Sequence, residues 1–232
     1  MRVLVIDTAL GACTTAVYEA DRCLAVRSDP MAKGHQERLG GLVRAVADEA
    51  GGFGDIDRIG VTVGPGSFTG LRVGLAFAQG LGAALGRPVV GISTLAALAW
   101  SPEGGGATAA VIDARRGQVY IQTFSDGAAT REPEALSILD AGALLAQANA
   151  GWRLVGSGAA LVQPDGEGNA GAEPYAAHNP TAAGLAALTI AADPATALPR
   201  PLYLRAPDAT PPTRLPGQAR TKPATAVDPA HP

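Results

Sequence analysis

The chain has 232 residues, 47% of them hydrophobic, which is enough to bury the core of one large domain or two small ones. Its formal net charge of −3 gives no overall attraction to a phosphate backbone, so composition argues against a protein that binds RNA on its own. No apolar stretch has the roughly 20 uninterrupted residues of a membrane helix, and the apolar run at the N-terminus meets an acid at once, so we expect a soluble, cytoplasmic protein without membrane contact.

The first hundred residues alternate between strands and helices. Apolar runs bounded by turn residues predict strands, and apolar residues that recur on one face predict helices. The predicted strands cover residues 3–7, 13–19, 24–27, 58–63 and 88–92, and the predicted helices cover 31–51 and 69–85. This order is typical of one ribonuclease-H-like lobe, a mixed sheet flanked by helices.

A flexible connection around residues 101–106 separates this lobe from the rest of the chain. The next strand, with Val111-Ile112-Asp113, repeats the opening pattern of Val5-Ile6-Asp7, a turn and a second strand, which suggests a duplicated unit. Further predicted elements are helices at 140–148 and 181–192 and a strand at 153–156. We therefore expect a first lobe at 1–103, a second, smaller lobe at 104–205, and a disordered tail rich in Pro and Ala at 206–232.

The two cysteines, Cys13 and Cys23, fall on successive strands of a predicted hairpin. They are about five residues out of register, roughly 16 Å apart, which is too far for a disulfide bond. Both are expected to be buried, reduced thiols, as in a cytosolic protein.

A glycine-rich loop joins the fourth strand to the second helix, with the sequence Gly-Pro-Gly-Ser-Phe-Thr-Gly-Leu-Arg over residues 64–72. Ser67 or Thr69 can cap the helix, and free backbone N–H groups at its start could bind an anion. The loop lacks the lysine of a P-loop and the glycine spacing of a nucleophile elbow. The alternative is a tight turn in which Gly64 and Gly66 permit close packing, and we favour this over phosphate binding.

Three further residues complete the candidate anion or nucleotide site. Asp7 and Thr8 end the first strand, where an acid can hold a metal that bridges ATP phosphates, and Asp113 occupies the matching place in the second lobe. Arg115 stands where a glycine is usual in this kind of loop, so a carboxylate that only caps a turn is an equal alternative. Arg72 opposes the helix dipole, so either an anion offsets its charge or it is an ordinary surface residue.

The second predicted helix carries a small residue at every fourth position: Gly70, Gly74, Ala78, Gly82 and Gly86. Each interior glycine costs roughly 0.8 to 1 kcal/mol relative to alanine, so a close approach by another backbone must offset the cost. That backbone could belong to the sheet beneath or to another subunit. Because larger apolar residues on another side of the helix can cover the sheet, we favour a subunit interface. The apolar face of the first helix would share it, with Met31, His35, Leu39, Leu42 and Val46. The three histidines are too dispersed to suggest a metal or catalytic site.

Together these motifs resemble the TsaB family, also called YeaZ, over about residues 1–208. The resemblance rests on residues 6–8, 35–37, 64–72, 113–120 and 201–205. It implies the actin-like/sugar-kinase superfold, with two ribonuclease-H-like lobes. It also implies a part in bacterial synthesis of threonylcarbamoyladenosine on tRNA, as the partner of the transferase TsaD.

The resemblance further implies a subunit without catalytic activity. TsaD carries a His-x-x-x-His metal pair, and alignment places Thr94 and Leu98 at the matching positions, where neither can act as the metal ligand. The implied role is to pair with TsaD through the first-lobe helices and to support recruitment of TsaE, an ATPase, and of tRNA. Homodimers would form through related surfaces, and ATP would be used by the wider complex, with no cofactor bound by this chain. The alternative is an ATP-dependent phosphotransferase of the same superfold that uses Asp7, Asp113 and the glycine-rich loop.

Overall fold

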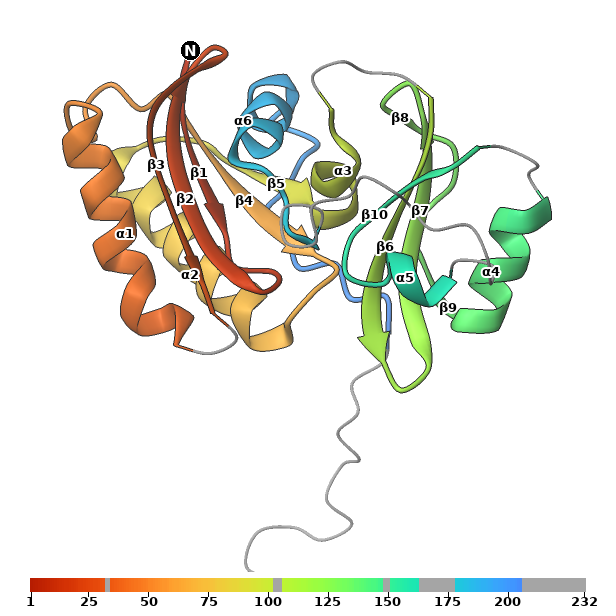
Figure 1. Cartoon of the computed structure of the whole chain (residues 1–232). Helices are drawn as coiled ribbons and strands as arrows, with labels where there is room; N and C mark the ends of the chain where they lie inside the picture. Colours follow the sequence, from red (N-terminus) through yellow and green to blue (C-terminus); the bar gives the residue numbers. More distant parts are fainter. Residues whose placement is uncertain (32–33, 102–105, 148–150, 163–177, 206–232) are drawn as a thin grey trace, which may run out of the picture.

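The computed structural model describes residues 1–31, 34–101, 106–147, 151–162 and 178–205. Two sheets stand side by side with helices packed on their faces (Figure 1). The strands are β1 (Arg2–Asp7), β2 (Ala12–Glu19), β3 (Arg22–Pro30), β4 (Arg58–Gly64), β5 (Val89–Ser93), β6 (Ala107–Arg115), β7 (Gln118–Ser125), β8 (Ala128–Ala129), β9 (Glu134–Ser137) and β10 (Arg153–Val155). The helices are α1 (His35–Glu49), α2 (Phe68–Leu85), α3 (Thr94–Ala99), α4 (Ile138–Gln147), α5 (Ala159–Val162) and α6 (Ala182–Ala191). The predicted boundary between 103 and 104 and the predicted tail at 206–232 lie outside the described residues.

The first sheet has the order β3-β2-β1-β4-β5, in which β2 is antiparallel to its neighbours and β1, β4 and β5 run parallel. Strand β1 is buried from Val3 to Asp7, as expected for a strand that is covered on both faces. Helices α1 and α2 cover one face and α6 covers the other (Figure 1). This is the ribonuclease-H-like arrangement that the sequence predicts.

The row of small residues on α2 packs against the sheet of its own lobe. A Cβ atom added at Gly74 would lie 2.4 Å from Thr8 Oγ1, and one added at Gly82 would lie 2.3 Å from a methyl carbon of Val89. By length and hydropathy alone α2 could cross a membrane, but one side of it packs on the sheet of its own chain. The expectation that the row itself faces another subunit is therefore corrected, because the sheet occupies it.

Helix α6 follows the second sheet in the sequence but packs on the first sheet. Leu185 packs with Val3 and Val90 on the face opposite α1 and α2. Gly60 makes this approach feasible, since an added Cβ atom would lie 1.8 Å from Thr189 Oγ1. The sequence predicts this helix within the second lobe, but the structure places it on the first, because the apolar parallel strands need cover on both faces.

The second sheet repeats the topology of the first. Strands β6 and β7 are antiparallel, β9 is antiparallel to β7, and β10 is parallel to β6, which reproduces the order β3-β2-β1-β4. The suggested duplication is thus confirmed, and the chain has the actin-like/sugar-kinase superfold. Strands β8 and β9 and helices α3 and α5 are absent from the predictions because they are too short to show a hydrophobic period.

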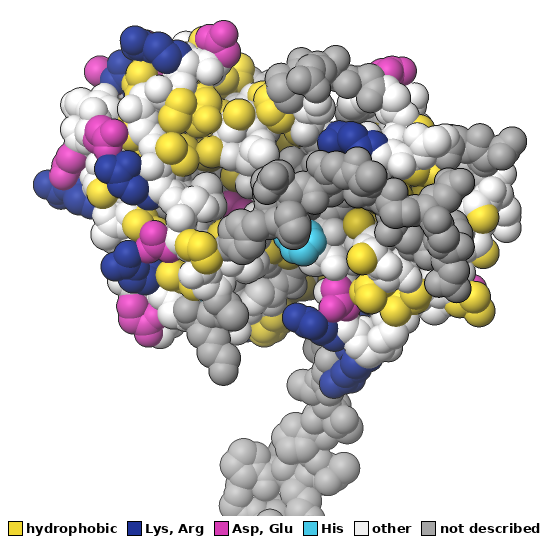
Figure 2. Space-filling view, in the orientation of Figure 1, with side chains coloured by type: hydrophobic (Ala, Val, Ile, Leu, Met, Phe, Trp, Pro, Cys, Tyr) yellow, Lys and Arg dark blue, Asp and Glu magenta, His cyan; other side chains and the backbone are white. Residues whose placement is uncertain are grey.

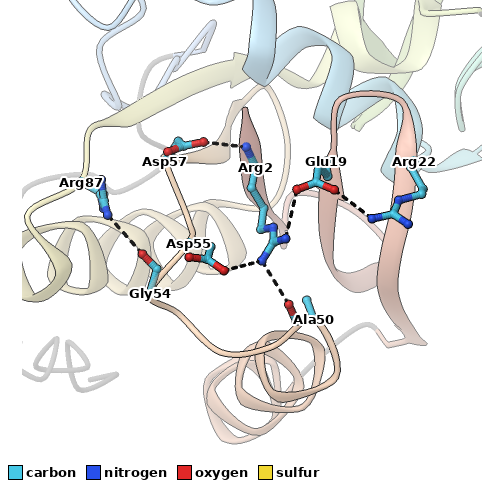
Figure 3. Close-up of polar contacts among 8 residues, drawn as sticks. All are labelled: Arg2, Glu19, Arg22, Ala50, Gly54, Asp55, Asp57 and Arg87. Atoms are coloured by element: carbon cyan, nitrogen blue, oxygen red, sulfur yellow. Dashed lines mark hydrogen bonds and ion pairs between the residues drawn. The ribbon is translucent and has the colours of Figure 1, made fainter.

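A network around Arg2 joins the start of the chain to the loop between α1 and β4 (Figure 3). The Arg2 guanidinium lies 3.0 Å from carboxylate oxygens of both Glu19 and Asp55, and it donates a hydrogen bond to Ala50 O at the end of α1. The backbone N–H of Arg2 donates to Asp57 Oδ2 at 2.7 Å. These bonds hold together the edge of the lobe at the start of β1. The glycine-rich loop lies at the other end of the parallel strands.

The cysteines lie on β2 and β3 as predicted, and neither forms a disulfide bond. Cys13 pairs with Asp29 and Cys23 with Tyr18, so the five-residue offset is confirmed. Cys13 is buried, and burial raises the pKa of its thiol to about 11. Cys23 is exposed, which corrects the expectation that both thiols are buried.

Candidate functional site

A cleft of about 450 Å³ lies between the two lobes. Its walls come from the β1–β2 turn at 9–11, from the glycine-rich loop, and from the end of β6, with further residues from β7 and the segment before α6. The lining residues include Gly66, Ser67, Asp113, Arg115, His178 and Asn179. The cleft is therefore the place where the two halves of the duplicated fold meet.

The glycine-rich loop is held tightly against the β1–β2 turn. The Ser67 N–H donates to Ala9 O at 2.7 Å, and a Cβ atom added at Gly66 would lie 2.4 Å from that same oxygen. Ser67 Oγ accepts a hydrogen bond from the Gly70 N–H and caps α2. Gly64 has a φ of 113°, and an added Cβ atom would lie 2.9 Å from Leu202 O. These contacts favour the tight-turn interpretation of the glycines.

Asp7 and Thr8 brace this loop from below and do not line the cleft. Asp7 is fully buried, and its Oδ1 accepts hydrogen bonds from the Ala9 N–H at 2.9 Å and from Thr62 Oγ1 at 2.8 Å. Burial raises the pKa of this carboxyl above its ordinary value, and the two hydrogen bonds and His35 offset only part of the effect. Thr8 Oγ1 donates to Gly70 O at 2.7 Å, which ties β1 to the first turn of α2.

Asp113 lies in the cleft, but its carboxylate is already engaged. Oδ1 accepts a hydrogen bond from the Arg115 N–H at 2.8 Å, and Oδ2 lies 3.1 Å from the Arg115 guanidinium. The Asp113 N–H donates to Ser157 Oγ at 3.1 Å. The residue therefore closes the β6–β7 turn, which is the capping role that the sequence leaves as an alternative to metal binding.

Arg72 stands apart from the other candidate anion ligands. Its guanidinium carbon lies 3.7 Å above the centre of the Phe68 ring, and its Nε donates to the Tyr203 hydroxyl at 3.3 Å. The predicted set thus divides into three parts. Gly66, Ser67 and Asp113 line the cleft, Asp7, Thr8 and Gly64 support the loop, and Arg72 belongs to an exposed aromatic cluster.

The structure adds two cleft residues that sequence reasoning missed. His178 and Asn179 line the cleft, and Asn179 Oδ1 accepts a hydrogen bond from the Gly11 N–H at 3.1 Å. They are far from the other lining residues in sequence, so no local pattern could place them there. The Asn-Pro step at 179–180 predicts only a turn.

The predicted partner face of α1 belongs to the core of this chain. Leu39, Leu42 and Val46 are buried in the cluster beneath the helix, and His35 is buried as well. The His35 Nε2 atom has no hydrogen-bond partner among the described residues. A partner that docks here would meet the outward sides of α1 and α2, where the exposed residues include Gly40, Gly41, Ala45, Ala76, Gly80 and Ala84.

Thr94 and Leu98 both lie on α3 and are buried, with Thr94 as its first residue. Within the described ranges, no group of three or more His, Cys, Asp or Glu side chains is arranged to hold a metal ion.

Comparison with known proteins gives consistent matches. A sequence profile of the TsaD family, tRNA N6-adenosine threonylcarbamoyltransferase, matches residues 29–157. The chain is 37% identical over 214 residues to an uncharacterized protein of Mycobacterium tuberculosis, covering 90% of this chain and 94% of that one. It is 37% identical over 124 residues to the tRNA threonylcarbamoyladenosine biosynthesis protein TsaB of Escherichia coli, covering 52% of this chain and 53% of TsaB.

Two solved structures from Pseudomonas aeruginosa share the fold over most of the chain. The structure of YeaZ superimposes with a TM-score of 0.68 at 28% identity, covering 88% of this chain and 99% of YeaZ. A protein described as similar to peptidase YEAZ gives a TM-score of 0.69 at 30% identity, with the same coverage.

Proposed function

Because the chain belongs to the TsaB/YeaZ family, which takes part in tRNA threonylcarbamoyladenosine biosynthesis, we propose that it is a non-catalytic subunit that pairs with a TsaD-type transferase. This proposal rests on Thr94 and Leu98, which align with the pair of metal-binding histidines of TsaD. A hydroxyl and an isobutyl group cannot take over that ligation. The proposed role is cytoplasmic, where bacterial tRNA is modified.

The electrostatics of the cleft favour a scaffold over a phosphotransferase. An ATP site needs cationic or metal-bound groups that are free to meet the phosphates. In this cleft Asp113 is paired with Arg115, while Asp7 is buried beneath the loop and its raised pKa disfavours the charged form. Among the described residues, the two acids that the phosphotransferase alternative would use are thus committed to other roles.

The outward sides of α1 and α2 are the proposed docking surface for the transferase. A Cβ atom added at Gly41 or at Gly80 would meet no described atom within 4 Å, so these helices present open, low-relief surface. Small residues let another backbone approach closely, which suits helix packing between subunits. The same surface is the proposed site of homodimers, and the paired complex would support recruitment of TsaE and tRNA.

The test is to place a bulky charge on each helix. Gly41→Arg and Gly80→Arg should fold, because each site is open and arginine raises helix propensity by up to about 1 kcal/mol relative to glycine. Each variant should nevertheless lose co-purification with a TsaD-type transferase, because the guanidinium would stand in the interface.

Gly151→Arg is the matched control, since Gly151 is equally open but lies in the second lobe. If both helix variants still co-purified like the wild type, the docking surface would have to be abandoned. The change Gly74→Leu cannot serve here, because Gly74 packs against Thr8 inside the chain.

A further inference from the structure

We propose that a surface of aromatic and arginine side chains beside the cleft binds a single-stranded segment of RNA. The surface consists of Phe68, Arg72, Tyr203, Arg205, Arg115 and Arg116, and we call it the aromatic–arginine surface. The inference rests on the proposed function, because it gives this subunit a direct contact with the RNA on which the complex acts.

The aromatic part is exposed and preformed. Phe68 is 50% exposed and Tyr203 is 45% exposed, and their ring centres lie 5.4 Å apart. Arg72 stacks over Phe68 and donates to the Tyr203 hydroxyl, so the three side chains hold one another in place. The chain has only four Phe and four Tyr, and it leaves one of each on this surface. Such stacked aromatic and guanidinium planes are what unpaired bases stack on.

The basic part continues from Tyr203 across to the second lobe. Two residues after Tyr203, the Arg205 guanidinium donates to Ala114 O at 3.0 Å, immediately before Arg115 and Arg116 in the chain. The side chain of Arg115 is 86% exposed, and Arg116 is exposed as well. Basic side chains are visible at the lower edge of the molecule, where β6 turns into β7 (Figures 1 and 2).

The local charge balance favours a polyanion. Helix α2 and the segment 194–205 contain no Asp or Glu, whereas Asp113 beside the surface forms an ion pair with Arg115 and so offsets one of its positive charges. The formal net charge of the whole chain is −3, so the overall composition does not reveal this local group of arginines. Arginines next to stacked aromatic rings match the phosphates and bases of a single strand.

The test uses the complex assembled with a TsaD-type transferase and measures the Kd for a transcribed tRNA substrate by fluorescence anisotropy. Tyr203→Ala should raise Kd by about 5-fold to 100-fold, the range expected when one base no longer stacks. Arg115→Glu with Arg116→Glu should also weaken binding. It should lower the slope of log Kd against log salt by roughly 0.7 for each phosphate that the variant no longer neutralises. Tyr203→Phe keeps the ring and should bind nearly as the wild type does.

The control for a single charge reversal away from the surface is Arg22→Glu, because Arg22 is 69% exposed and lies on the β2–β3 hairpin beside the Arg2 network (Figure 3). It should leave Kd unchanged. Unchanged Kd in the surface variants, with complex assembly intact, would overturn the RNA contact and leave the proposed function standing. If the surface variants no longer bound the transferase but kept their affinity for RNA, the surface would be a protein contact. That result would also overturn the proposed RNA contact.

Discussion

At the scale of single residues, Asp7 shows how environment decides the role of a carboxylate. Its position at the end of β1 agrees with a metal-bridging acid, which is why the sequence predicts it in a candidate nucleotide site. Burial then removes it from the cleft and commits its Oδ1 to the Ala9 N–H and the Thr62 hydroxyl. Sequence alone could not predict this, because the depth of a side chain depends on Thr62 and on the loop that covers it.

The raised pKa of Asp7 gives a prediction about stability and pH. A folded-state pKa above the ordinary value of 3.8 means that folding favours the protonated form, so the contribution of Asp7 to stability falls as pH rises through the folded-state pKa. Asp7→Asn keeps an oxygen acceptor and cannot ionise. The variant should therefore melt at a higher temperature than the wild type at pH 8 and at a similar temperature at pH 4, as followed by calorimetry. A lower melting temperature for the variant at pH 8 would contradict this interpretation of the buried charge.

At the scale of elements, α2 shows what periodicity can and cannot predict. The spacing of four correctly indicates that Gly70, Gly74, Ala78 and Gly82 share one side that something approaches closely. It does not say which neighbour makes the approach. The larger residues Phe77, Leu81 and Leu85 do pack against the core cluster between the helices and the sheet, as predicted. The small row meets the sheet as well, which the prediction did not expect.

Two substitutions on α2 should therefore behave in opposite ways. Gly74→Leu pushes a side chain toward Thr8 and Val61 and should lower the free energy of unfolding by about 3 kcal/mol or more, through overpacking. Gly80→Arg points into open space and should leave that free energy unchanged or slightly raised. Urea denaturation of the isolated chain measures both. Equal losses in the two variants would mean that the helix is turned differently on the sheet.

At the scale of the whole molecule, the sequence predicts the fold class and the duplication but not how the chain is shared between the lobes. The repeated order of strand, turn and strand is visible in the residues themselves, whereas the return of α6 to the first sheet depends on contacts such as Gly60 with Thr189. The same holds for the cleft, where Asn179 meets Gly11 from 168 residues away in the chain. Such long-range contacts leave no local pattern to interpret.

Reconstituted transfer of the threonylcarbamoyl group to tRNA tests the central claim most directly. A TsaD-type transferase, with the rest of its system supplied, is assayed alone and with increasing amounts of this chain. We predict no product from this chain without the transferase, activity that rises to saturation as wild-type chain is added, and little or no rise with Gly80→Arg. Product formed by this chain without the transferase, or transferase activity that does not depend on it, would contradict a non-catalytic partner.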